Sequence, residues 1–132
     1  MELSKINRVY FVGIGGIGMS AIARYFAKRG VLVCGYDKTR TKLTEQLESE
    51  GILVSYNDEE ATIPDAFKNN NDETLIVYTP AIPKNSAVLN HFLDGGFSLK
   101  KRPGNQAVFV AVNSLNLPLS LYKLVLHKFI FQ

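Results

Sequence analysis

The chain lacks most features that would point to secretion, a membrane or a metal centre. Cys34 is the single cysteine among 132 residues, so no internal disulfide can form, and its apolar neighbours predict a buried thiol. The segment before Arg8 has no apolar stretch of the signal-peptide kind, and no continuous apolar run is long enough to span a bilayer. These absences favour a cytoplasmic protein without a membrane partner.

Catalytic and metal-binding signatures are also missing. His91 and His127 have no cysteine, serine or carboxylate at a useful spacing, so neither is expected to be catalytic. No cluster of residues has the spacing of metal ligands, and no G-x-x-x-x-G-K-[ST] motif offers a site for the β- and γ-phosphates of ATP. We therefore predict no catalytic residue, no metal and no cofactor in this chain.

Acidic residues are absent from the C-terminal part of the chain. All twelve lie at or before Asp94, so residues 1–94 carry ten Lys and Arg against twelve Asp and Glu, a net charge of −2. The remaining residues carry five basic side chains and no acid, which makes the overall net charge +3. A nucleic-acid binder would show a basic face across its folded unit, so we expect no nucleic-acid partner.

What is present is an alternation of short apolar runs and helical patterns. A hydrophobic share of 46% in 132 residues is enough for one packed domain. The patterns predict helices over 17–29, 41–50 and 85–94, one helical turn after Pro64, and strands over 8–13, 31–36, 52–56, 74–78 and 97–99. Strands separated by helices predict an α/β fold, an open parallel sheet of about five strands with helices on both faces.

Residues 103–132 do not continue this pattern. Leu115, Leu117, Leu119 and Leu121 repeat with a period of two, whereas Leu121, Leu124 and Val125 have helical spacing. Because the first pattern indicates a strand and the second a helix, the secondary structure of this tail is only poorly predicted. We divide the chain into a domain over 1–102 and a divergent tail over 103–132.

A glycine-rich motif follows the first expected strand. Residues Gly13-Ile14-Gly15-Gly16-Ile17-Gly18 match G-x-G-x-x-G and open a helix, and Asp37 ends the next strand. The first glycine allows a tight turn, the second a close approach of backbone N–H groups to a diphosphate, and the third close helix–strand packing. The helix dipole favours the phosphate charge, and Asp37 is placed to accept hydrogen bonds from ribose hydroxyls.

The motif leaves the ligand open. NAD, FAD and UDP-sugars all contain a diphosphate beside a ribose, and a tight turn without a ligand, with Asp37 as a helix-capping residue, is the structural alternative. An NAD(P)-binding regulatory or dehydrogenase module is accordingly an alternative function.

Further motifs carry a resemblance to a known family. In chain order the motifs are Val12 to Ser20 (VGIGGIGMS), Gly35 to Asp37 (GYD), Tyr78 to Pro83 (YTPAIP) with Asn85, and Lys100 to Arg102 (KKR). Their order and spacing over residues 6–102 resemble the N-terminal domain of the UDP-N-acetylmuramate–L-alanine ligases of the Mur ligase family. The resemblance implies a cytoplasmic step of peptidoglycan synthesis, an ADP-forming amide ligase that uses ATP and Mg2+, and a Rossmann-like first domain that holds the UDP part of UDP-N-acetylmuramate.

The resemblance also implies roles for particular residues. The diphosphate would lie in the turn formed by Gly13, Gly15, Gly16, Ile17, Gly18 and Met19. Asp37 would bind near the nucleotide end, and Arg102 would help to neutralise phosphate. Thr79, Ala81 and Ile82 would line the uridine site; the alternatives are a rigid proline turn at 79–83 and a solvated charge run at 100–102.

The match ends after Arg102. The family continues into a second domain with a Gly-Thr-His-Gly-Lys-Thr ATP loop, whereas here Asn113-Ser-Leu-Asn-Leu-Pro118 follows an apolar run. The third, amino-acid-binding domain is also absent, so we expect the isolated chain not to form the amide. A natural truncation, a shifted reading frame or an expressed fragment would each explain the tail, and a homodimer contact is the alternative role for it.

Overall fold

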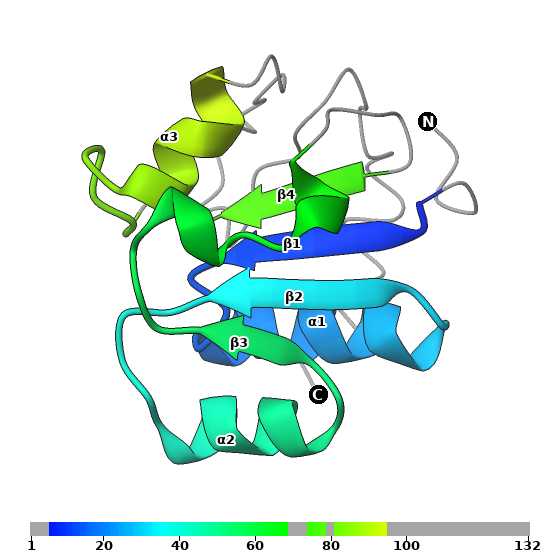
Figure 1. Ribbon diagram of the computed structural model, residues 1–132. Helices are drawn as coiled ribbons and strands as arrows, with labels where there is room; N and C mark the ends of the chain where they lie inside the picture. The colour runs from blue at the N-terminus through cyan, green and yellow to red at the C-terminus, as the bar shows by residue number, and fades with distance from the viewer. Residues whose placement is uncertain (1–5, 69–73, 79–80, 95–132) are drawn as a thin grey trace, which may run out of the picture.

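The computed structural model describes residues 6–68, 74–78 and 81–94 of the chain. Its strands are β1 (Arg8–Val12), β2 (Leu32–Tyr36), β3 (Leu53–Ser55) and β4 (Thr74–Tyr78). They form a sheet of order β3-β2-β1-β4 in which every pair is parallel (Figure 1). The predicted α/β fold with an open parallel sheet is confirmed, with four strands among the described residues; the expected fifth strand at 97–99 lies outside them.

Helices lie on both faces of this sheet. The helices α1 (Ile17–Lys28) and α2 (Lys42–Ser49) pack on one face, and α3 (Ala87–Asp94) packs on the other (Figure 1). Two 3-10 turns, η2 (Glu60–Thr62) and η3 (Asp65–Phe67), occupy the connection between β3 and β4, where one turn after Pro64 was predicted. The helix patterns were therefore read correctly, to within two residues at each end.

The alternation of side chains along β1 divides the interior into two cores. Val9 and Phe11 point toward α1 and α2, and Tyr10 and Val12 point toward α3. The central strand is fully apolar after Arg8 because it is covered on both faces, as the continuous hydrophobic run predicted.

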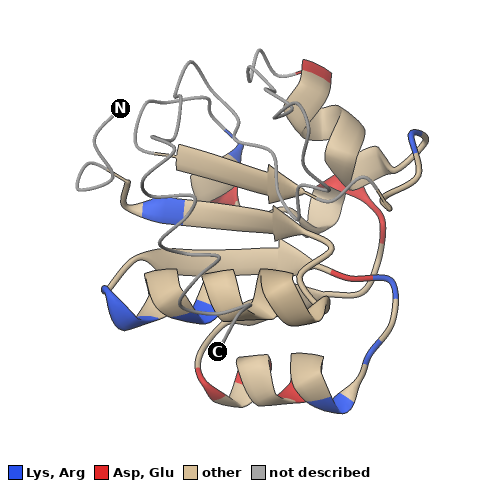
Figure 2. Cartoon of the chain, turned by 180° about the vertical axis from the view of Figure 1, so that it is seen from behind, with Lys and Arg blue, Asp and Glu red and all other residues tan. Residues whose placement is uncertain are grey.

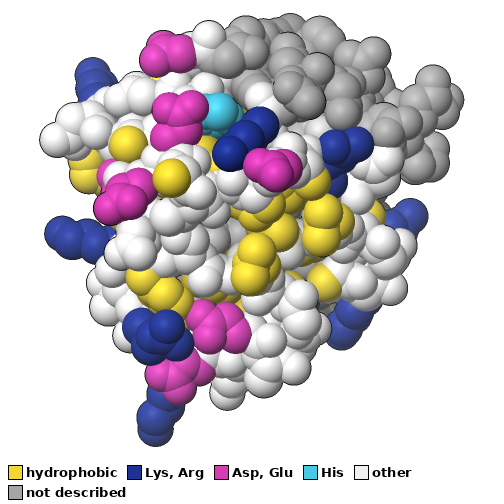
Figure 3. All heavy atoms as spheres, in the orientation of Figure 1, with side chains coloured by type: hydrophobic (Ala, Val, Ile, Leu, Met, Phe, Trp, Pro, Cys, Tyr) yellow, Lys and Arg dark blue, Asp and Glu magenta, His cyan; other side chains and the backbone are white. Residues whose placement is uncertain are grey.

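Part of the face that carries α3 is left open. Leu32 and Leu53 are 49% and 61% exposed, and both lie on the same face as Cys34, because Cys34 pairs with Leu53 and side chains alternate along β2. Figure 3 shows hydrophobic side chains at the surface in this region. No described helix is both long and apolar enough to cross a bilayer.

Candidate functional site

The predicted glycine turn joins β1 to α1. Gly13 has a positive φ of 97°, which side chains rarely adopt, and this accounts for glycine at that position. The backbone N–H groups of Gly13 and Ile14 both donate to the carbonyl oxygen of Tyr36, at 2.8 and 2.9 Å. The turn is thereby attached to the end of β2.

Gly15 brings the turn against Asp37. Its N–H donates to Oδ2 of Asp37 at 2.7 Å. A Cβ atom on Gly15 would lie 2.6 Å from that oxygen and 3.0 Å from Cγ2 of Thr44. Glycine is required here because a carboxylate occupies the space that a side chain would need.

Asp37 has backbone partners on both carboxylate oxygens. Besides Gly15 at Oδ2, the N–H of Thr39 donates to Oδ1 at 3.0 Å. The motif predicted that Asp37 accepts hydrogen bonds from a ligand; in the structure this carboxylate organises the loops after β1 and β2. Each oxygen retains a second lone pair, so a ligand contact remains chemically open.

The start of α1 carries uncapped amides. Its N-cap residue, Gly16, offers no side chain, the first turn contains no acid, and Ser20 is the residue whose N–H donates to the Gly16 carbonyl oxygen. The N–H groups that precede Ser20 in the helix have no intrahelical acceptor. Together with the helix dipole they make this turn suitable for an anion.

The side chains of this first turn differ in exposure. Ile17 is 83% exposed, and Gly18 is half-buried. Met19 is 1% exposed and belongs to the core between the sheet and the helices α1 and α2. Met19 can therefore contribute to the predicted diphosphate cradle only through its backbone.

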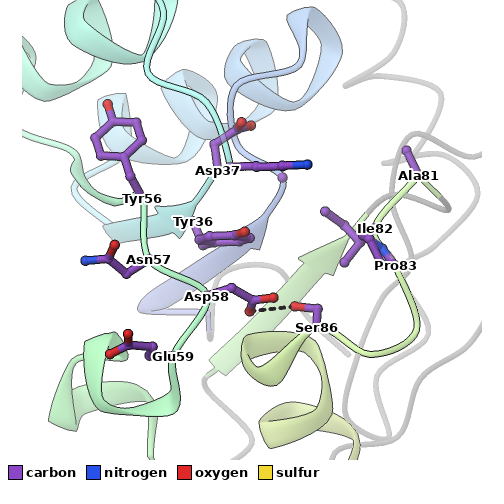
Figure 4. Close-up of a pocket in the computed structure, with 12 residues that line it drawn as sticks. Tyr36, Asp37, Tyr56, Asn57, Asp58, Glu59, Ala81, Ile82, Pro83 and Ser86 are labelled. Atoms are coloured by element: carbon purple, nitrogen blue, oxygen red, sulfur yellow. Dashed lines mark hydrogen bonds between the residues drawn. The ribbon is translucent and has the colours of Figure 1, made fainter.

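A cleft of about 610 Å³ opens beside the glycine turn, at the carboxyl ends of the strands (Figure 4). It is lined by residues that follow β1, β2 and β3 and by the segment that leads into α3, namely Gly13, Tyr36, Asp37, Lys38, Tyr56, Asn57, Asp58, Glu59, Ala81, Ile82, Pro83 and Ser86. Ligands of open parallel sheets bind at this edge, where loops from neighbouring strands meet.

The structure brings several of the predicted site residues together. Gly13, Asp37, Ala81 and Ile82 line the cleft. Five others belong to the adjoining turn and first helical turn rather than to the lining: Gly15, Gly16, Ile17, Gly18 and Met19. Thr79 and Arg102 lie outside the described residues.

The loop after β3 was missed by the sequence analysis. Tyr56, Asn57, Asp58 and Glu59 all line the cleft, as does Ser86 before α3. These residues belong to no motif, but the parallel sheet itself was a usable signal, because the loop after every such strand lies at the same edge.

Asp58 connects two walls of the cleft. Its Oδ1 accepts hydrogen bonds from the hydroxyl of Ser86 at 2.8 Å and from the N–H of Val88 at 2.9 Å. The Ser86 hydroxyl oxygen in turn accepts from the N–H of Leu89 at 3.2 Å. Two N–H groups at the start of α3 are thereby capped, one of them from a distant loop, and the helix is held to the loop after β3.

The cleft is rich in acids and neutral phenols. Its lining contains three carboxylates and one lysine, and Figure 2 shows acidic and basic segments along the connections at this end of the sheet. Burial, and secondarily the charges of Asp58 and Asp37, raise the pKa of Tyr36 above its usual value. Burial and the hydrogen bond to Glu48 likewise raise the pKa of Tyr56, whose hydroxyl donates to that carboxylate at 2.6 Å. Both phenols are therefore neutral at physiological pH.

The donor set does not fit a metal ion. Among the described residues no group of three or more His, Cys, Asp and Glu side chains is placed to hold one. Divalent cations bind to such converging carboxylates and imidazoles. The three cleft carboxylates are instead spread over the loops after β2 and β3, two of them committed to backbone or hydroxyl donors.

Comparison with known proteins identifies the family. Residues 8–113 match the family model described as "Mur ligase family, catalytic domain", and the chain belongs to the Mur ligase family. Within it, the chain is 51% identical over 102 residues to the UDP-N-acetylmuramate–L-alanine ligase of Parabacteroides distasonis, covering 77% of this chain and 22% of that protein. It is 54% identical over 97 residues to the ligase of the same name from Porphyromonas gingivalis, covering 74% and 21%.

Solved structures agree with this assignment. The crystal structure of a UDP-N-acetylmuramate–alanine ligase from Thermotoga maritima superposes with a TM-score of 0.55 at 30% identity, over 66% of this chain and 19% of that one. A ligase for UDP-N-acetylmuramate and L-alanyl-γ-D-glutamyl-meso-diaminopimelate from Neisseria meningitides also has a TM-score of 0.55, at 27% identity, over 67% of this chain and 26% of that one. The predicted family resemblance is confirmed, and the chain spans about a fifth of the length of the curated relatives.

Proposed function

We propose that this chain is the uridine-nucleotide-binding part of a UDP-N-acetylmuramate–L-alanine ligase, and that it binds UDP-N-acetylmuramate through the UDP group. The observation that carries the proposal is the cleft at the carboxyl ends of the parallel strands, directly beside an uncapped glycine turn. The names of the relatives support the choice of a uridine ligand over NAD(P).

The charge distribution supports one orientation of the ligand. A diphosphate is attracted to the amides of Ile17, Gly18 and Met19, which lack an intrahelical acceptor, and to the positive end of the α1 dipole. The carboxylates of the neighbouring cleft repel phosphate, so the nucleoside occupies that space, against Tyr36 and Ile82. Thr79 and Arg102 are proposed as additional contacts to the uridine and the phosphates.

We further propose that the amide-forming step needs parts that this chain does not supply. ATP and Mg2+ are expected in the longer ligases, whereas this sequence has no ATP loop and its described residues offer no metal-ligand cluster. The single buried cysteine supports a cytoplasmic setting for the protein.

Titration calorimetry tests the binding proposal directly. The chain should bind UDP and UDP-N-acetylmuramate with micromolar dissociation constants. NADH and NADPH should bind at least tenfold more weakly, which corresponds to a difference of about 1.4 kcal/mol in binding free energy. Tighter binding of NADH than of either uridine ligand would instead favour a nicotinamide-binding module.

An ADP-release assay tests the second proposal. With ATP, Mg2+, UDP-N-acetylmuramate and L-alanine, the chain should release no ADP above the rate measured without L-alanine. Amide formation by the isolated chain would show that it carries its own ATP site.

A further inference from the structure

We propose that Asp58 is the carboxylate that recognises a neutral hydrogen-bond donor on the bound nucleoside, the role that the glycine motif would assign to Asp37. This inference rests on the proposed function and specifies which residue of the cleft reads the ligand. It follows from how the two carboxylates are hydrogen-bonded.

Asp37 is occupied by the protein backbone. Oδ2 accepts from Gly15 N–H at 2.7 Å and Oδ1 accepts from Thr39 N–H at 3.0 Å. Each oxygen thus already accepts one hydrogen bond that shapes the loops, and rotating the side chain to aim an oxygen at a ligand would leave two backbone amides without their acceptor. The loss costs most at Gly15, whose hydrogen bond is partly buried, because the hydrogen bond of Thr39 is exposed to water that can replace it.

Asp58 is anchored at one oxygen only. Oδ1 accepts from Ser86 Oγ and Val88 N–H, whereas its second oxygen accepts no hydrogen bond from the described chain. Figure 4 shows the side chain reaching from the loop after β3 into the space between Tyr36 and Ser86. The two hydrogen bonds hold the carboxylate in one orientation, so its second oxygen is presented to the cleft without loss of side-chain freedom on binding.

The chemistry of a carboxylate limits what it can recognise. An ionised carboxylate only accepts hydrogen bonds, and it repels phosphate. A nucleoside diphosphate offers two kinds of neutral donor, the ribose hydroxyls and the base N–H. The donor that meets Asp58 is therefore one of these, and the diphosphate lies toward the glycine turn.

Substitution by asparagine separates recognition from folding. Asp58→Asn keeps an oxygen that can accept from Ser86 and Val88, but it replaces the second oxygen with an amide N–H2 that cannot accept. Because the bond is charge-assisted, UDP affinity should fall about tenfold to a hundredfold in calorimetry. If Asp58 only repelled the diphosphate, removing its charge would instead tighten UDP binding.

The control removes the same charge elsewhere. Asp65→Asn alters a carboxylate that is 96% exposed in η3, outside the cleft lining, and should leave UDP affinity within about twofold. Thermal unfolding of both variants checks that α3 remains docked. If Asp58→Asn does not fold, Ser86→Ala, which removes one of the two anchoring donors and keeps the carboxylate, should weaken UDP binding by a smaller factor.

Ligand analogues identify the donor. UDP, 2′-deoxy-UDP, 3′-deoxy-UDP and N3-methyl-UDP are each titrated into the unmodified chain, Asp58→Asn and Asp37→Asn. One analogue should bind the unmodified chain at least tenfold more weakly than UDP, and that penalty should disappear in Asp58→Asn but persist in Asp37→Asn.

Three results would overturn the inference. If the penalty disappears in Asp37→Asn instead, Asp37 is the recognising residue. If Asp58→Asn binds UDP at least as tightly as the unmodified chain, Asp58 makes no favourable contact. In both cases the proposed uridine-binding function stands. Failure of the unmodified chain to bind UDP at all would remove the inference together with that function.

Discussion

At the scale of single residues, glycine is required at different positions of the turn for different physical reasons. Gly13 adopts a positive φ, whereas Gly15 is needed because the Asp37 carboxylate lies where a side chain would be. Gly16, by contrast, has an extended backbone with φ of −67°, and a Cβ atom added there would lie 3.6 Å from its nearest neighbouring atom. The glycines of one motif therefore differ in how well they tolerate substitution by a residue with a side chain.

Alanine substitutions should show this inequality. Gly15→Ala should destabilise the fold by about 1–3 kcal/mol and weaken UDP binding, because the new methyl group displaces Asp37. Gly16→Ala, the matched control, should cost less than about 1 kcal/mol, since its site has room and Gly and Ala differ there only as N-cap residues. Urea unfolding and UDP titration measure both; equal losses in the two variants would contradict the close-approach explanation.

At the scale of elements, the helices begin in different ways. Thr41 and Thr44 form a reciprocal capping box at α2, in which the Thr44 N–H donates to the Thr41 hydroxyl at 3.2 Å and the Thr41 N–H donates to the Thr44 hydroxyl at 2.8 Å. The start of α3 is capped by Ser86 and by Asp58 from another loop, and α1 has no side-chain cap. Among the described α-helices, the one without a side-chain cap is the one that faces the proposed diphosphate.

The capping box of α2 predicts a measurable stability difference. Thr41→Ala removes the hydroxyl acceptor and should lower the free energy of unfolding by about 1 kcal/mol. Thr41→Ser retains the hydroxyl and should lose less than half of that amount. Chemical denaturation of both variants decides the point, and a serine variant as unstable as the alanine variant would show that the methyl packing of Thr41, not its cap, stabilises α2.

At the scale of the whole molecule, a buried thiol and a buried phenol on the α3 face of the sheet make the free energy of unfolding depend on pH in the alkaline range. Burial raises the pKa of Cys34 from 9.0 to about 11. Burial, and then the neighbouring charges of Cys34, Asp58 and Tyr36, raise the pKa of Tyr10 even further above its usual 10.0. In the described chain the Tyr10 hydroxyl has no hydrogen-bond partner that would stabilise its charged form.

The sign of the pH effect follows from these raised values. In the folded state both groups keep their proton to higher pH than in the unfolded chain. The stabilising contribution of Cys34 is complete below pH 9 and is lost as the pH rises toward 11, whereas that of Tyr10 begins to be lost only above pH 10. Each group contributes a slope of up to about 1.4 kcal/mol per pH unit. Cys34→Ala should make the decline between pH 9 and 10 shallower in urea unfolding; an unchanged slope would mean that the thiol does not take part.

Most of the fold could be predicted from local sequence patterns. The strand and helix ranges required only hydrophobic periodicity and the glycines that follow α1 and α2, Gly30 and Gly51, both of which have positive φ. The glycine motif likewise located the turn beside the cleft. The ligand-contact roles given to Thr79, Ala81, Ile82 and Arg102 remain predictions.

The roles of Asp37 and Asp58 could not be predicted in this way. Asp37 was located correctly at the end of β2, but its hydrogen bonds to Gly15 and Thr39 depend on the path of two loops. Asp58 carried no motif, and its partners, Ser86 and Val88, lie 28 and 30 residues further along the chain.

The sequence by itself determined the strand–helix alternation, the parallel sheet and the glycine turn, because each depends on the spacing of residues that are close in the chain. Only the tertiary structure decided that the carboxylate of Asp37 accepts hydrogen bonds at both oxygens and that of Asp58 at one. That choice depends on segments after β2 and β3 meeting α1 and α3 at one edge of the sheet, where directional hydrogen bonds between distant residues select a single arrangement.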